Sequence, residues 1–282
     1  MGADWRAVKD CCAARWLLSG LMSTTEDFLR RHPLCCFCGG SEPASTIDSQ
    51  PAKIVFPDDL RPEEREFPAC ASCTKQTSAD EALLALICRL IGSPQRDLAP
   101  EFDRLRETFT TVRQRFPGLL ERMGQGQIFI QRRGRLVREG RINVNQREVH
   151  ESMCRIAAKL ALAIYYESKG TPAPTTCRIK TLWTHCQNAA TFQQVTNTIR
   201  VNAGKWQGNK NFFLTFLLEG GMLASMSIFH EAVAFIALLQ AAPSRLEGNE
   251  HWAFVMAPEA GSGIRIIRPR RGDPRTRTTV LR

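Results

Sequence analysis

Four cysteines in two pairs are the residues of this sequence best suited to chemistry. Cys35 and Cys38 form one C-x-x-C pair, Cys70 and Cys73 form a second, and 31 residues lie between the pairs. Two residues between cysteines allow both sulfurs to face one metal ion from a tight turn, and two such turns complete a tetrahedral thiolate site. Glycines behind the first pair suit the left-handed backbone of such a turn. The spacing predicts one structural zinc ion bound by these four side chains.

The composition favours metal ligation over disulfide bonding. The chain has 282 residues, of which eleven are cysteines, and a hydrophobic content of 43%. A chain with that much apolar material has no need of disulfide staples, and charged residues interrupt the first 22 positions, so no secretory signal is visible. The longest apolar runs fall far short of the roughly 20 residues that a membrane-spanning helix requires. We expect a cytoplasmic protein that does not enter the membrane.

The net charge of +10 points to a polyanionic partner. Nucleic acid, most simply DNA, is the first candidate and an acidic membrane surface the second. Two arginine clusters localise this charge. Residues 127–142 predict a β-hairpin with a cationic face, although a solvated surface hairpin fits equally. Residues 261–282 carry seven arginines against one acid and predict a flexible phosphate-gripping tail, with simple disorder as the alternative. The candidate nucleic-acid-binding residues are Arg132, Arg133, Arg135, Arg138, Arg141, Arg268, Arg270 and Arg271.

A helix is expected to follow the second cysteine pair. The run from Ser78 to Glu81 matches a capping box, in which the serine caps the helix and the glutamate reaches back. The apolar residues that begin at Leu83 recur at helical spacing directly afterwards. The order is therefore knuckle, extended segment, knuckle and helix.

This stretch resembles the zinc-bearing HNH endonucleases, which have a ββα-metal or treble-clef architecture. The resemblance is carried by three segments, Thr46–Pro51, Phe67–Thr74 and Ser78–Glu81, and continues more weakly toward residue 240. In that family a histidine after the aspartate is the general base, and an asparagine follows the last cysteine. Ser49 and Thr74 stand at those positions here. A serine hydroxyl is no base near neutral pH, so the resemblance implies a scaffold that has lost its chemistry.

Three carboxylates remain near the catalytic positions that the resemblance defines. Asp48 could hold Mg²⁺ or Mn²⁺ together with Asp80 or Glu81 if the protein is an active nuclease. The alternative interpretation is structural, since acidic residues suit a helix N-terminus and Asp48 can cap a turn. An active enzyme would also need a relocated base, for which His32 and His150 are the candidates.

We expect an α+β protein with four parts. They are an N-terminal amphipathic helix over 1–30, an HNH-like zinc module over 31–92, a helical and antiparallel-sheet domain over 93–242, and an arginine-rich C-terminal segment over 243–282. In the third part, helical spacing over 101–123 and 145–167 predicts two helices, and a glycine pair at 220–221 predicts a hairpin.

Three functions are compatible with these patterns. The first is a nucleic-acid-binding protein on a catalytically inactive HNH-type scaffold. The second is a metal-dependent HNH-family nuclease with a relocated base. The third is a non-catalytic DNA-binding subunit of a larger ribonucleoprotein, such as a CRISPR-type or other defence complex, which would add protein partners. The missing histidine favours a protein that is not an enzyme.

Overall fold

A computed structural model describes most of the central part of the chain. The described residues are 24–57, 61–63, 65–91, 102–124, 126–132, 135–185, 204–206, 212–230, 233–241, 254–259 and 263–267. Most of the expected N-terminal helix over 1–30 and the arginines from 268 onward lie outside these ranges, as does Arg133. Those expectations stay predictions.

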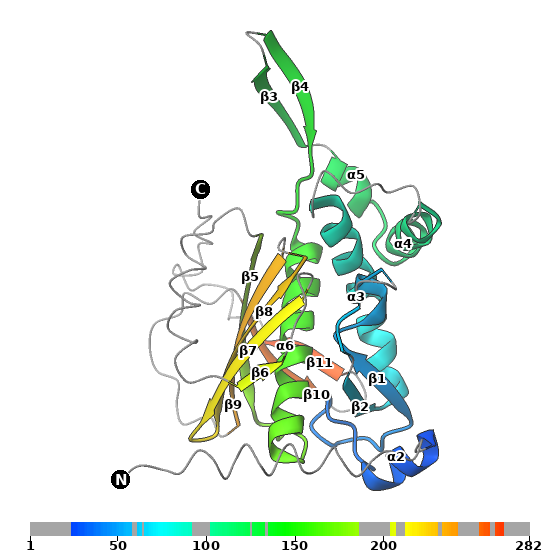
Figure 1. The fold of residues 1–282 in the computed structure, drawn as a ribbon, viewed down its shortest axis with the longest axis vertical. Coiled ribbons are helices and arrows are strands. Elements are labelled where there is room, and N and C mark those ends of the chain that lie inside the picture. The colour runs from blue at the N-terminus through cyan, green and yellow to red at the C-terminus, as the bar shows by residue number, and fades with distance from the viewer. Residues whose placement is uncertain are drawn as a thin grey trace.

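The fold is α+β, as expected, with three layers (Figure 1). A seven-stranded sheet packs on the long helix α6, and α6 in turn packs on α3. The helices are α2 (Thr25–Arg31), α3 (Ala71–Ile91), α4 (Phe102–Arg115), α5 (Leu119–Gly124) and α6 (Arg147–Lys169), with a short 3-10 turn η1 (Lys53–Val55).

Every strand pair among the described residues is antiparallel, and the large sheet has the order β11-β10-β5-β9-β8-β7-β6. Two further two-stranded sheets, β1-β2 and β3-β4, stand apart from it. The strands are β1 (Thr46–Gln50), β2 (Arg65–Ala69), β3 (Gly126–Arg132), β4 (Arg135–Arg141), β5 (Arg178–His185), β6 (Gly204–Trp206), β7 (Phe212–Glu219), β8 (Met222–Phe229), β9 (Val233–Gln240), β10 (Phe254–Glu259) and β11 (Gly263–Ile267).

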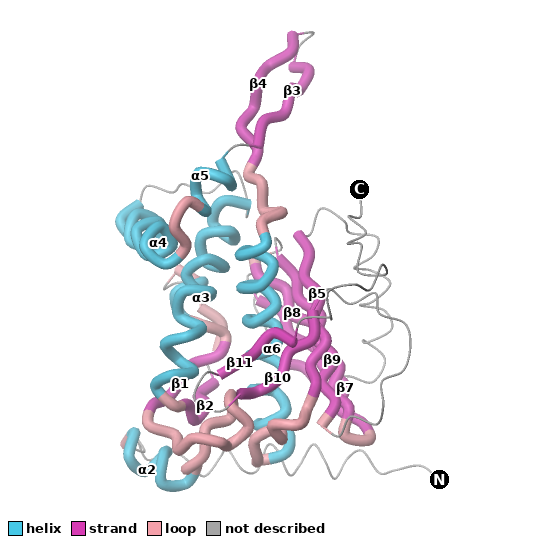
Figure 2. The backbone as a smooth tube through the Cα atoms, turned by 180° about the vertical axis from the view of Figure 1, so that it is seen from behind, coloured by secondary structure: helices cyan, strands magenta, loops and turns pink. Residues whose placement is uncertain are grey.

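Helix α6 is the centre of the molecule. Its predicted apolar stripe is confirmed, and burial extends around the helix because the sheet covers one side and α3 the other. Figure 2 shows this sandwich from behind. The helix ends at Gly170, which adopts the left-handed conformation (φ 71°) that glycine tolerates best.

The predicted glycine-pair hairpin is also confirmed. Strands β7 and β8 are joined by Gly220 and Gly221, with φ of 57° and 80°. Positive φ at both central residues is typical of the two-residue hairpin turn whose twist matches that of the flanking strands.

Two helix predictions are wrong in their boundaries. Helix α3 begins at Ala71, so Ser78 lies inside the helix, where its hydroxyl donates to the carbonyl of Lys75. The cap lies at the second cysteine pair instead, because the hydroxyl of Ser45 accepts the first amide of the helix. The expected helix over 101–123 is two helices, since Gly118 (φ 72°) separates α4 from α5.

The C-terminal segment over 243–282 is structured in part. Strands β10 and β11 come from it and complete one edge of the sheet, so this stretch belongs to the body of the protein. The amide of Gln76 on α3 pairs with both backbone groups of Ile264 on the edge strand β11. The buried core is accordingly continuous from the cysteine pairs to β11.

Candidate metal centre and the buried ammonium site

The structure brings the four predicted cysteines together at one point. Their sulfur atoms all lie within 4.8 Å of one another, and all four residues are buried and free of disulfides. A tetrahedral ion with metal–sulfur bonds of about 2.3 Å places its sulfurs about 3.8 Å apart, so small adjustments suffice to hold it. Among the described residues this is the one group of cysteine, histidine and carboxylate side chains that could bind a metal ion.

Local geometry explains the first cysteine turn. Gly39 and Gly40 have φ of 69° and 75°, as their position after the pair predicts. A Cβ atom on Gly39 would lie 2.9 Å from the carbonyl oxygen of Ala173, in the loop that follows α6. The position therefore requires glycine for both backbone conformation and space. Cys36 lies in the same turn but takes no part in the cluster, and burial raises the pKa of its thiol.

The close approach of the sulfurs shifts the pKa of Cys38 and of Cys73 in opposite directions. Hydrogen bonds with Cys35 and Cys73 lower the pKa of Cys38 to about 3, whereas hydrogen bonds with Cys35 and Cys38 raise the pKa of Cys73. Sulfurs this close cannot all ionise without a cation among them, since each thiolate repels the next. A metal ion bound by all four would remove that conflict and cross-link the two turns.

A second buried centre lies beside the cysteines and contains a lysine where the nuclease hypothesis would place a metal ion. The side chain of Lys159, on α6, is 1% exposed. Its ammonium nitrogen lies 2.8 Å from Oδ2 of Asp48, 2.8 Å from the hydroxyl of Thr77 and 2.5 Å from Oε1 of Glu81. Three acceptors satisfy the three donors of an ammonium group, which is what allows a charge to stay buried.

The second oxygen of Asp48 is also engaged. The side-chain amide of Gln50 donates to its Oδ1 at 2.7 Å, and both residues face the interior from β1. Asp48 is therefore held between an amide and an ammonium group. We call Asp48, Thr77, Glu81 and Lys159 the ammonium site.

Electrostatics keep the lysine charged. Burial opposes the charged form, but the coulombic attraction of Glu81 and Asp48 outweighs it and raises the pKa of Lys159 above its ordinary value. Burial raises the pKa of Glu81, and Lys159 offsets part of that rise. A single ammonium group thus stabilises the negative charge of two carboxylates.

The ammonium site touches the cysteine cluster at two points. The hydroxyl of Thr77 accepts from Lys159 and donates to the carbonyl of Cys73 at 3.2 Å. The ring of Phe37, between the first two cysteines, has its centroid 5.2 Å from the lysine nitrogen, within cation–π range. A substitution at either centre is therefore expected to alter the geometry of the other.

Asp80, the third carboxylate of the nuclease hypothesis, lies outside the ammonium site. It binds the guanidinium of Arg155 through two hydrogen bonds of 2.7 Å each. Arg155 and Lys159 are one turn apart on α6, which is why both face the acidic turn of α3.

The positions that the family resemblance singles out lie on either side of Asp48. Ser49 is the next residue of β1, so it occupies the opposite face of the strand from Asp48 and Gln50. Thr74 contacts Oδ2 of Asp48 through a long 3.4 Å hydrogen bond. Neither offers a base to this site.

The candidate relocated bases are engaged elsewhere. Nδ1 of His32 lies 2.7 Å from the hydroxyl of Tyr166, at the far end of α6. The indole of Trp183 donates to Nδ1 of His150 at 2.8 Å, and burial lowers the pKa of that imidazole. Both histidines join helices to their neighbours.

The predicted basic hairpin is confirmed as a hairpin, and it projects from the body beyond α5 (Figure 1). Its register pairs Arg132 with Arg135 and Arg138 with Phe129. Arg132, Arg135 and Arg141 therefore share one parity in the strand register, and Arg138 has the other. The expectation of a cationic face stays a prediction.

Sequence reasoning missed the ammonium site and a basic pocket beside η1. A lysine within the apolar run of α6 was the available signal for the first, because buried lysines require partners. The pocket is formed by Lys53, Arg61, Arg89 and Arg104, which are distant in the sequence. No local pattern connects them.

No family model matches this chain, and comparisons with curated proteins and with solved structures return no match. In the described part of the chain, none of the helices combines the length and apolarity needed to cross a membrane.

Proposed function

We propose that this protein is a zinc-stabilised nucleic-acid-binding protein built on a catalytically inactive HNH-type scaffold. The four buried cysteines would hold Zn²⁺ as thiolates, and the ion would act as a cross-link between the two turns. The local order of turn, β1-β2 hairpin, second turn and α3 supports the treble-clef likeness that the sequence motifs imply.

The observation that carries the inactive half of the proposal is the position of the Lys159 ammonium group. It lies within 2.8 Å of Asp48 and Glu81, two carboxylates that a nuclease of this type would need for a divalent cation. An ammonium group supplies the same sign of charge without a Lewis-acid site or a bound water, so it stabilises the scaffold and activates nothing.

Binding to nucleic acid is supported by charge and shape. The chain carries a net charge of +10, and the hairpin β3-β4 projects from the body with an arginine-rich sequence. A two-stranded ribbon can enter the major groove of DNA, and arginine can pair with phosphate through two hydrogen bonds.

Filter binding of labelled duplex DNA and single-stranded RNA at about 50 and about 200 mM salt tests the proposal. We expect the affinity to fall by at least tenfold between the two conditions, because phosphate contacts release counterions. The paired variant Arg135→Gln/Arg138→Gln should bind more weakly than wild type. Affinity that ignores salt, or no binding to either nucleic acid, would overturn the proposal.

A further inference from the structure

A concave pocket between η1, α3 and α4 gathers positive charge from separate parts of the fold. Its volume is about 240 Å³, and the described residues that line it include four cations and one acid, Glu107. The cations are Lys53, Arg61, Arg89 and Arg104. Lys53, Arg61 and Arg104 are solvent-exposed, so a ligand can reach them.

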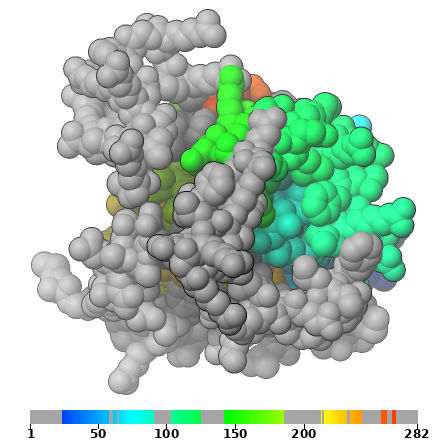
Figure 3. Space-filling model, turned by 90° about the horizontal axis from the view of Figure 1, so that it is seen from above, coloured from blue at the N-terminus to red at the C-terminus, as the bar shows by residue number. Residues whose placement is uncertain are grey.

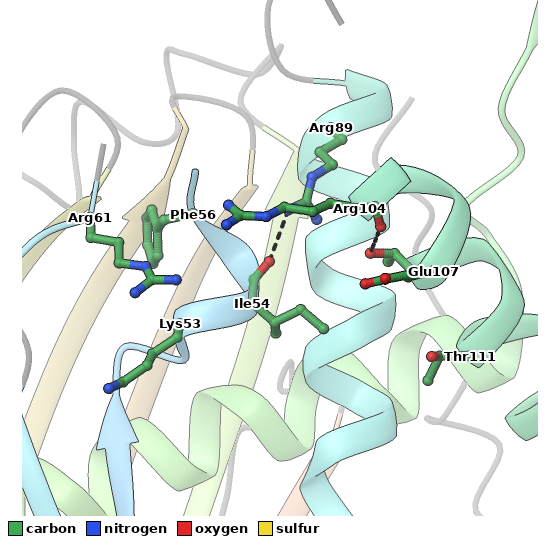
Figure 4. A pocket seen from close by; sticks show the side chains of 9 residues that line it. Lys53, Ile54, Phe56, Arg61, Arg89, Arg104, Glu107 and Thr111 are labelled. Atoms are coloured by element: carbon green, nitrogen blue, oxygen red, sulfur yellow. Dashed lines mark hydrogen bonds between the residues drawn. The ribbon is translucent and has the colours of Figure 1, made fainter. Parts of the chain in front are cut away.

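The fold holds this arrangement in place. A guanidinium nitrogen of Arg89 donates to the carbonyl of Ile54 at 3.0 Å, which fixes the arginine of α3 against η1. The close-up in Figure 4 shows the side chains of Arg61 and Arg104 extending toward Phe56 from the two sides of the view. Phe56 is itself anchored in the core by stacking on Phe229. The pocket is therefore built on the rigid body of the protein.

We propose that this pocket binds phosphate groups of a nucleic-acid backbone; the inference rests on the function proposed above. Four cations and one acid give the described lining a formal net charge of +3, which favours an anionic ligand. Two neighbouring phosphodiester groups fit both this charge and a volume larger than one phosphate. Arginine forks match phosphate oxygens in pairs, and the exposed side chain of Ile54 adds an apolar contact for the sugar between them.

The helix α4, which contributes Arg104 and Glu107 to the pocket, is followed in the chain by α5 and the basic hairpin. Helices α4 and α5 form an uncovered surface in the view from above (Figure 3). The projecting hairpin follows α5 directly in the chain, and α4 lines the pocket, so both basic features are attached to this pair of helices. A bound strand could therefore contact both the pocket and the hairpin.

The test compares two double variants of equal charge. Arg61→Gln/Arg104→Gln removes two exposed cations from the pocket and leaves Arg89 to hold η1. Lys75→Gln/Lys169→Gln removes two exposed cations near the opposite end of α3 and α6 and serves as the control. Thermal unfolding of both variants verifies that they fold.

We expect the pocket variant to bind labelled duplex DNA about tenfold more weakly than the control variant at about 100 mM salt, and its salt slope to decrease by about 2. Equal losses in the two variants, with wild-type binding intact, would overturn the pocket proposal and leave the proposed function standing.

Inorganic phosphate separates the pocket from the proposed function. At matched ionic strength, phosphate should raise the melting temperature of wild type more than chloride does, and the pocket variant should lose this difference. If wild type binds no nucleic acid, the proposed function fails. The difference in melting temperature between phosphate and chloride then tests by itself whether the pocket binds phosphate. No difference between phosphate and chloride in wild type would then overturn the pocket as well.

Discussion

Replacing Lys159 with methionine should destabilise the fold in a way that depends on pH. Methionine keeps the length and apolar contacts of the side chain but removes the charge from between Asp48 and Glu81. Those carboxylates would then face each other in the core without a cation. Breaking a buried ion pair from one side costs about 3 to 5 kcal/mol, so we expect a loss of that size at about pH 7.5.

The pH dependence follows from the carboxyl groups. Burial already raises the pKa of Glu81, and without Lys159 the pKa rises further because the neighbour that lowers it is gone. A carboxyl whose folded pKa exceeds its unfolded value of about 4.3 favours the folded state at low pH and loses that contribution as pH rises through this window. The deficit of the variant relative to wild type should therefore shrink as pH falls toward about 5.

Urea unfolding followed by far-ultraviolet circular dichroism, at about pH 5 and about pH 7.5, measures both quantities. The triple variant Lys159→Met/Asp48→Asn/Glu81→Gln is the matched control, because it removes the stranded charges and should recover about 2 kcal/mol or more. A deficit below about 1 kcal/mol, or one equal at the two pH values, would refute the account of the ammonium site.

Three further predictions concern the cysteine turns and His150. Gly39→Ala should cost about 2 kcal/mol or more in urea unfolding, from the positive φ and from a carbonyl oxygen 2.9 Å from the new methyl; a neutral effect would contradict the turn geometry. Metal analysis should find one zinc per chain in wild type and in Cys36→Ala but none in Cys38→Ser, whereas loss of zinc from both variants would place Cys36 in the site. Burial holds the folded pKa of His150 below its unfolded value of about 6.5. The contribution of the neutral imidazole to the free energy of unfolding is therefore fully present above about pH 6.5 and is lost as pH falls through the folded pKa. The melting temperature of His150→Gln, which keeps an acceptor for the indole of Trp183, should thus fall less than that of wild type between about pH 7.5 and about pH 5.

The metal centre could be predicted from sequence because its signal is local. Two cysteines three positions apart define a turn by themselves, and the glycines after Cys38 carry the required positive φ. The α+β class and the central helix were accessible for the same reason, since apolar periodicity over 145–167 does not depend on the rest of the chain.

The features that sequence reasoning missed depend on contacts across the fold. Lys159 meets Asp48 and Glu81 from 111 and 78 positions away, and no spacing rule links those residues. The error at Ser78 has a similar origin. Ser78 and Glu81 satisfy a capping pattern, but the helix already begins at Ala71, beside the second cysteine pair. Glu81 therefore does not cap the helix and accepts a hydrogen bond from Lys159 instead. At Ser78, contacts across the fold thus override the local preference for a helix start.

The distinction between binding and cutting tests the central claim most directly. Wild-type protein and Asp48→Ala would be incubated with labelled duplex DNA in Mg²⁺ or Mn²⁺, and one native and one denaturing gel would be run from each mixture. The account predicts a retarded complex on the native gel that weakens with added salt, and intact DNA on the denaturing gel for both proteins. Cleavage by wild type that disappears in Asp48→Ala would contradict it, because Asp48 would then serve a catalytic metal ion and not the Lys159 ammonium group.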